Sequence, residues 1–224
     1  MDRELFIQPS VRIRNLEKKL LTKSQFERLY EADDLQDSIR HLNETVYSED
    51  LAKIDRPENF EVALSNSLNK TYNEDLSLCP VKELVDVLTY RFAFHNIKVA
   101  VKEKILQEDF EHIYSKVHYE DLDNLRKQFE TEKGEKGTWY EDTVIQAYKT
   151  FEETKDPEKI EFFIDKRYFE KVLEISKKFE LDLVEEYFRA MIDFVNIRTF
   201  IRCKRQEQDI SVLKEALIQG GYID

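Results

Sequence analysis

The chain has 224 residues, of which 37% are charged and 41% are hydrophobic, and its formal net charge is -12. This length is sufficient for one large domain or two small ones with a buried core. The sequence has four glycines and four prolines, and so few turn-forming residues disfavour a β-rich fold. The acidic balance argues against general affinity for nucleic acid or anionic lipid, which need clustered positive charge.

Helix start signals are dense in the first half of the chain. A helix is expected after Pro9 and Ser10, and the Ser24-x-x-Glu27 pattern predicts a capping box at the start of the next helix. Pro80 opens the longest predicted helix. The expected helices cover about residues 11–21, 24–32, 34–47, 58–72, 80–106, 109–116 and 119–132.

The second half begins with a charged glycine-bearing segment, EKGEKG (132–137), which is expected to be an exposed loop. Apolar residues between Leu183 and Val195 recur at steps of three and four, which is one face of a helix. The expected helices are about 138–153, 156–179, 181–206 and a short last one that Asp209 or Ser211 caps and Gly220-Gly221 stops. The predicted fold class is therefore all-α, with long amphipathic helices.

One helical pattern occurs twice, one hundred positions apart. RFAFHNIKVAVKEK (91–104) and MIDFVNIRTFIRCKRQ (191–206) share Phe94 with Phe194 and Asn96 with Asn196. A third basic stretch at 12–14 aligns with 102–104 and 202–204. We therefore predict pseudo-repeated helical domains within residues 1–224, at approximately 1–100, 101–200 and an incomplete 201–224.

The third repeat is expected to leave an apolar surface uncovered, because a unit cut at its first helices cannot bury its own apolar face. The sequence is accordingly predicted to be truncated. The residues expected to be exposed are Ile210, Leu213, Leu217 and Ile218, which are spaced as one face of a short helix.

Several ordered motifs, which run the whole length of the chain, resemble one family. The sequence is similar to the C subunit of the bacterial and archaeal V/A-type ATPases, which is related to the d subunit of the eukaryotic vacuolar enzyme. The motifs are Arg12-x-Arg14-x-x-Glu17 with Leu20-Leu21; Tyr30-x-Ala32-Asp33 and Leu42-x-x-Thr45-x-Tyr47; Phe94-x-Asn96-Ile97-Lys98; Ile164-Asp165 with Tyr168-Phe169; Ile192-Asp193-x-x-Asn196-Ile197-x-x-x-Ile201-Arg202-x-Lys204; and Gly220-Gly221-Tyr222-Ile223.

The resemblance implies a funnel-like protein of three pseudo-equivalent helical domains that performs no chemistry itself. In that family the protein is a rotor component of the central stalk. It couples the shaft of the ATP-hydrolysing head to the membrane ring that translocates protons or sodium ions, and it lies at the cytoplasmic face of the membrane. Two other classes stay open: a helical adaptor or scaffold that binds another protein through a concave face, and a helical enzyme whose site is incomplete in this sequence.

Four basic residues are candidates for partner contact: Lys98 with Lys102, and Arg198 with Arg202. Each pair is four residues apart and shares a helix face. The pairs could hold acidic groups of a shaft or ring protein, or they could pair with acids on neighbouring helices of the protein itself. Asn96 and Asn196 are expected to satisfy the backbone of a neighbouring helix and so to fix helix packing.

No pattern of catalytic or cofactor-binding residues is found in the sequence. The glycines cannot form a P-loop or a GxGxxG turn, and the four histidines form no HExxH or Glu-x-x-His motif. The only two cysteines, Cys79 and Cys203, form neither a disulfide framework nor a metal site, so we expect both to be reduced, as in a cytosolic protein. No uncharged run exceeds eight residues, so no transmembrane segment is predicted, and the N-terminus lacks a signal-peptide apolar region. We expect a protein that is not an enzyme, with no cofactor, no metal and no nucleic-acid partner.

Overall fold

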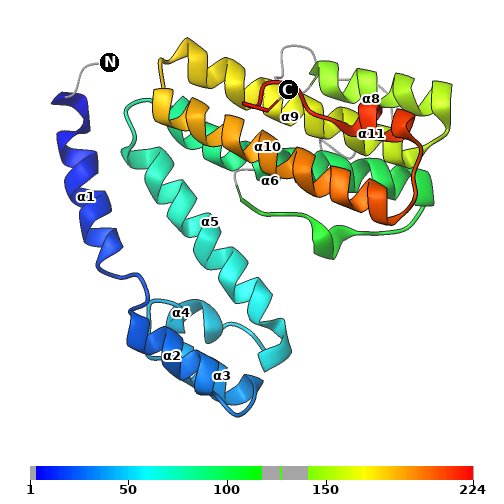
Figure 1. Cartoon of the computed structure of the whole chain (residues 1–224). Coiled ribbons are helices and arrows are strands. Elements are labelled where there is room, and N and C mark those ends of the chain that lie inside the picture. The colour runs from blue at the N-terminus through cyan, green and yellow to red at the C-terminus, as the bar shows by residue number, and fades with distance from the viewer. Residues whose placement is uncertain (1–3, 118–126, 128–140, 224) are drawn as a thin grey trace. The chain divides into compact units, whose positions relative to one another are not determined.

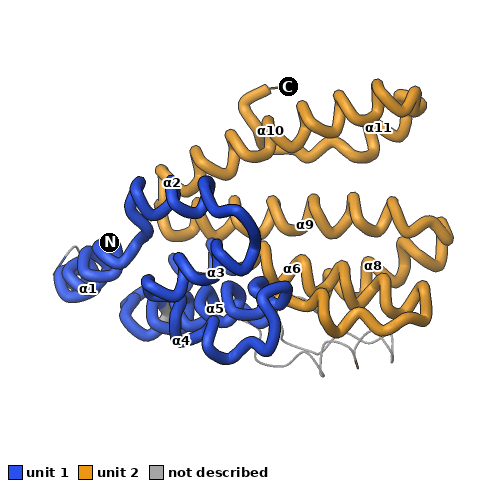
Figure 2. Tube along the Cα trace, turned by 90° about the horizontal axis from the view of Figure 1, so that it is seen from below, with its two compact units in different colours: residues 1–89, 116–118 blue, residues 90–115, 119–224 orange. Residues whose placement is uncertain are grey.

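The structure is a computed structural model that describes residues 4–117, 127 and 141–223. Within these residues all regular structure is helical and no strand occurs, so the all-α prediction is confirmed. The chain forms two compact units, residues 1–89 with 116–118 and residues 90–115 with 119–224 (Figure 2). The division falls inside one long helix and not near residues 100 and 200, and the proposed repeats remain a prediction.

The first unit consists of short helices, one longer helix and the beginning of a helix that continues into the second unit (Figure 1). Helices α2 and α3 pack against each other, as do α4 and α5. The side chain of Arg12 on α1 forms a salt bridge with Glu74 on α5 at 2.5 Å. The helices are α1 (Ile7–Glu17), α2 (Lys23–Glu31), α3 (Leu35–Leu42), α4 (Ser48–Leu51), α5 (Phe60–Leu78) and α6 (Lys82–Leu106).

A buried carboxylate joins α4 to α5. The side chain of Asp50 is 4% exposed, and its Oδ1 accepts hydrogen bonds from Lys70 Nζ at 2.8 Å and Lys53 Nζ at 3.4 Å. The same two ammonium groups donate to Glu49, and these hydrogen bonds hold the pKa of Glu49 below its ordinary value. Hydrogen bonding to Asp50 and Glu49 raises the pKa of Lys70. The hydrogen bonds therefore favour the charged forms of Glu49 and Lys70.

The first unit corrects two expectations about helix ends. The capping box of α2 uses Thr22 and Gln25: the Gln25 N–H donates to Thr22 Oγ1 at 3.4 Å, and the Thr22 N–H donates to Gln25 Oε1 at 2.8 Å. The expected Ser24–Glu27 box is wrong, because α2 begins at Lys23 with Thr22 as its cap, and Ser24 lies inside the helix. Helix α3 ends at Leu42, earlier than residue 47.

The second unit is built from long helices in layers. Figure 2 shows α9 between α10 with α11 on one side and α6 with α8 on the other. The most completely buried side chains of this unit include Ile160, Ile164 and Val172 of α9 and Ile192 of α10. Besides most of α6, the helices are α8 (Glu141–Thr154), α9 (Pro157–Lys178), α10 (Asp182–Arg205) and α11 (Ile210–Ala216).

The connection after α6 is less helical than predicted. The expected helix at 109–116 is reduced to the 3-10 turn Glu111–Ile113. The Glu103 side chain accepts a hydrogen bond from the Phe110 N–H at 2.9 Å. This side-chain contact takes the place of a helical backbone hydrogen bond at Phe110. The helix expected at 119–132 and the capping pattern that begins at Thr138 lie almost wholly outside the described residues.

Candidate functional site

Helices α6 and α10 end in the same way, one hundred residues apart. Gln107 and Glu207 follow them with left-handed φ values of 54° and 52°, a common way to end a helix. Two residues later, Asp109 and Asp209 each accept a hydrogen bond from the backbone N–H two positions further on, at 2.8 and 2.7 Å. The sequence echo therefore has a local structural counterpart at these positions.

The paired asparagines clamp the segment that follows each helix. Asn96 Nδ2 donates to the Ser115 carbonyl at 2.9 Å, and Asn96 Oδ1 accepts from the Ser115 N–H at 2.8 Å. Asn196 makes the same two hydrogen bonds with Ile218, at 2.8 and 2.9 Å. The expected backbone hydrogen bonds are present, but they fix the returning segment and not a neighbouring helix. Both helices thus hold the chain that returns along them.

A carboxylate and two glycines dock the last described residues on α10. The buried Asp193 accepts hydrogen bonds from the Tyr222 N–H at 3.0 Å and the Ile223 N–H at 3.1 Å. A Cβ atom on Gly221 would lie 2.1 Å from Asp193 Oδ1, and Gly220 has a φ of +103°. The glycines were expected to stop the last helix, but α11 already ends at Ala216. Their role is to allow this close approach and left-handed backbone, which no sequence pattern had indicated.

The equivalent faces of α6 and α10 differ in burial. Phe94 is 4% exposed and Phe194 is 69% exposed; Ile97 is 0% exposed and Ile197 is 44% exposed. The Phe94 ring packs edge-on against Tyr168 of α9, with ring centroids 5.6 Å apart. Helix α9 thus covers one face, while the corresponding face of α10 is open.

The basic residues on the two helices differ in the same way. Lys98 Nζ lies 2.5 Å from Asp165 Oδ1, and Lys102 Nζ lies 2.7 Å from Glu161 Oε1. Both acids belong to α9, so the two lysines are engaged within their own unit. Within the described part of the chain, Arg198 and Arg202 are exposed and have no ion-pair partner.

The open face of α10 forms a groove of about 600 Å³ with apolar and basic walls. We call it the α10 groove; its lining residues are Phe194, Ile197, Arg198, Ile201, Arg202, Arg205 and Gln206. A second pocket of about 290 Å³, formed with the returning segment, shares Ile197 and adds Phe200. Phe200 and Ile201 are 50% and 45% exposed, so the apolar surface continues beyond a single side chain.

The apolar surface was expected on the last helix instead. Ile210 is 67% exposed, as predicted, but Ile218 is only 5% exposed. The prediction is wrong at Ile218 because the Asn196 clamp holds its backbone against α10. Leu213 and Leu217 are half-buried. The larger apolar exposure lies on α10.

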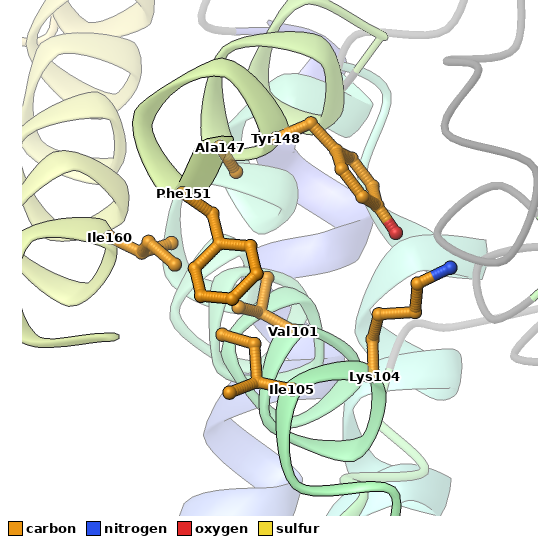
Figure 3. A pocket seen from close by; sticks show the side chains of 7 residues that line it. All are labelled: Val101, Lys104, Ile105, Ala147, Tyr148, Phe151 and Ile160. Atoms are coloured by element: carbon orange, nitrogen blue, oxygen red, sulfur yellow. The ribbon is translucent and has the colours of Figure 1, made fainter. Parts of the chain in front are cut away.

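A small cavity between α6, α8 and α9 offers no ligand site. Its volume is about 10 Å³, enough for about one water molecule. Figure 3 shows its mainly apolar lining, in which Lys104 Nζ lies 5.8 Å from the centroid of the Tyr148 ring. The other lining residues are Val101, Ile105, Ala147, Phe151 and Ile160. Across residues 4–117, 127 and 141–223, no group of three or more histidine, cysteine or acidic side chains could hold a metal ion.

Fold and site together define an all-α protein with an exposed groove of apolar and basic side chains on α10. None of the helices in the described residues combines the length and apolarity needed to cross a membrane. The family model of the ATP synthase (C/AC39) subunit matches residues 9–224, and the chain belongs to this family. The family resemblance seen in the sequence is thereby confirmed.

Curated relatives carry matching names. The chain is 24% identical over 219 residues to the C subunit of the V-type sodium ATPase of Enterococcus hirae, covering 97% of this chain and 66% of the relative. It is 28% identical over 230 residues to the C subunit of the A-type ATP synthase of Desulfurococcus sp., covering 96% and 62%. The corresponding Pyrococcus horikoshii protein is 27% identical over 233 residues, covering 96% and 60%. The chain therefore spans 60–66% of the length of these relatives.

Proposed function

We propose that the chain is a non-catalytic rotor component in the central stalk of a V-type ATPase or ATP synthase. In this role it couples the shaft of the ATP-hydrolysing head to the ion-translocating ring in the membrane. Its partners are the shaft proteins and the ring, and its place is peripheral, at the cytoplasmic face of the membrane. The observation that carries the proposal is the family match over residues 9–224, together with relatives that are named as C subunits of such enzymes.

The helical architecture of the second unit supports a coupling role. A protein that transmits torque must resist twisting, and close-packed interiors deform little. Helices α6, α9 and α10 have 25, 22 and 24 residues. They pack through buried apolar side chains such as Ile164 and Ile192, both 0% exposed. Stiffness of this kind suits a coupling protein.

The test is a binding titration of the purified chain against a purified shaft protein and against the detergent-solubilised ring. We expect saturable binding to at least one of them. An unrelated helical protein of similar net negative charge is the control for nonspecific adhesion. Absence of binding to both the shaft and the ring, with the helical circular dichroism intact, would contradict the rotor assignment.

A further inference from the structure

The segment that follows α11 is held to the long helices largely through its backbone. We propose that residues 217–223, called the strap from here on, open and close as one unit over the seam between α9 and α10. Figure 1 shows the strap, in red, running back along these two helices from the end of α11. The inference concerns a motion inside the second unit and does not depend on the rotor role.

Three side chains of α10 anchor the strap, and each bonds to its backbone. They lie three and four residues apart and therefore share one face of the helix. Arg189 adds a contact with a side chain, since its Cζ lies 4.5 Å from the centroid of the Tyr222 ring. The anchors are Asn196 with the N–H and carbonyl of Ile218, Asp193 with the N–H groups of Tyr222 and Ile223, and Arg189 with the carbonyl of Gly221 at 3.2 Å.

Gly220 places the strap against both helices. A Cβ atom at this residue would lie 2.9 Å from Leu173 Cδ1 on α9 and 3.6 Å from Ile192 Cδ1 on α10. Ile192 is 0% exposed and Leu173 is half-buried. The strap therefore covers apolar side chains that belong to two different helices, and its opening would uncover them together.

Little apolar burial opposes the opening of the strap. Ile218 is the one buried side chain among residues 217–223, whereas α9 alone buries Ile160, Ile164, Val172 and others. Segments with few buried apolar contacts and with hydrogen bonds near solvent open at a lower free energy than the core. We therefore place the strap among the parts of this unit that open without global unfolding.

The anchors are coupled because they are few and lie close together. Ile218 and Tyr222 are separated by only three residues, of which two are the glycines. Loss of one anchor returns conformational freedom to this short stretch, and glycine regains more freedom than any other residue. The remaining anchor then has to restrain a looser segment, so opening at one end favours opening at the other.

An open strap would change what α10 presents to its surroundings. The Asp193 carboxylate and the Asn196 amide would lose their backbone partners, and Ile192 would become accessible beside them. These groups can bond to the backbone of another extended segment in the same way. A ligand that binds them only in the open state would shift the strap toward that state.

The test is native-state hydrogen exchange of the full chain, followed by NMR at low urea concentrations. In the parent chain we expect the amides of Ile218, Tyr222 and Ile223 to share one opening free energy and one urea dependence. Their exchange should be faster than that of the Ser115 amide, which the fully buried Asn96 holds, and faster than that of amides inside α9.

Two substitutions then disturb one end of the strap each. Asn196→Ala removes the Ile218 anchor alone, and Gly221→Ala forces a Cβ to within 2.1 Å of Asp193 Oδ1. We expect Asn196→Ala to speed exchange at Tyr222 and Ile223, and Gly221→Ala to speed exchange at Ile218, by about ten-fold or more in each case. Gln219→Ala, at an exposed residue of the strap, is the matched control and should leave all three amides unchanged.

Circular dichroism verifies that each variant is folded, and the comparison within the parent chain needs no variant. Strap amides that exchange only as slowly as those inside α9 would overturn the proposal, because the strap would then open only with the whole unit. A response confined to the end that carries the substitution would also overturn it, since the anchors would be independent. Neither result bears on binding to the shaft or the ring.

Discussion

The two clamping asparagines make identical hydrogen bonds in different surroundings. Asn96 is fully buried, whereas Asn196 is half-buried beside an open pocket. A buried donor or acceptor that loses its partner costs more than one that water can reach. The two residues therefore provide a comparison of the same contact at two depths.

We predict that Asn96→Leu lowers the free energy of unfolding by about 1–3 kcal/mol, because the backbone groups of Ser115 lose their partners. Asn196→Leu should cost less, since water can replace part of what Ile218 loses. Urea unfolding of the purified variants is the measurement. Asn73→Leu, at an exposed asparagine, is the control and should be close to neutral. Equal stability of Asn96→Leu and the parent chain would refute the structural role.

Helices α6 and α10 share a pattern of residues but not their neighbours. In α6 the basic residues are ion-paired with α9, and in α10 the corresponding residues are open. Charge reversal on the two helices should therefore affect different properties. On α6 it should change stability, and on α10 it should change association.

We predict that Lys98→Glu destabilises the second unit by about 1 kcal/mol, because a partly exposed attraction to Asp165 becomes a repulsion. Adding Asp165→Lys should recover much of the loss, as a double-mutant cycle in thermal unfolding would show. Arg198→Glu is the matched control and should leave stability unchanged. A loss of stability in Arg198→Glu as large as that in Lys98→Glu would show that the two helix faces are equivalent after all.

The start of α11 is predicted to depend on pH through its capping residue. The hydrogen bond from the Ser211 N–H holds the pKa of Asp209 below its ordinary value of 3.8. A carboxyl whose folded-state pKa is lowered contributes stability that is complete above 3.8 and is lost as pH falls through the lower folded-state pKa. The parent chain should therefore melt above Asp209→Ala at pH 6, and the two curves should converge in acid.

Melting curves recorded by circular dichroism between pH 6 and about pH 2 would test this convergence, because the capping carboxylate of Asp209 becomes protonated at the acid end of this range. Asp209→Asn is the useful comparison, since its side chain still caps but does not titrate in this range. A gap between the parent chain and Asp209→Ala that stays constant into strong acid would contradict the prediction.

At the scale of the whole chain, the α10 groove and the neighbouring Phe200 form an uncovered apolar surface within the described residues. Phe194, Phe200 and Ile201 are each 45–69% exposed on one helix, and an exposed apolar patch of this kind marks a binding surface. We therefore expect this surface to bind apolar probes in solution.

We predict that the chain binds a solvatochromic apolar dye and that Phe194→Ser with Ile201→Ser removes most of this fluorescence while circular dichroism is unchanged. Leu5→Ser with Ile7→Ser, at two exposed apolar residues away from α10, is the control and should remove less. Undiminished dye fluorescence in the Phe194 and Ile201 variant would place the dye-binding surface elsewhere.

Sequence alone determined the helical class, most long helices and the echo between residues 91–104 and 191–206. These follow from local information: the spacing of apolar residues, the capping residues and the few glycines and prolines. Sequence alone also identified the family, because the order and spacing of many weak motifs can be recognised without knowing which residues are in contact. The repetition of Asn96 and Asn196 could be recognised from the sequence, but the backbone groups to which they hydrogen-bond could not.

Only the tertiary structure decided which of two similar helix faces is occupied. Lys98 and Arg198 are equivalent in the sequence, yet one faces Asp165 and the other is open, because burial depends on a helix distant along the chain. The glycine pair after α11 was likewise ambiguous. Glycine is needed there because the side chain of Asp193, 27 residues or more earlier in the chain, lies against the backbone of the pair. No local pattern encodes such a contact.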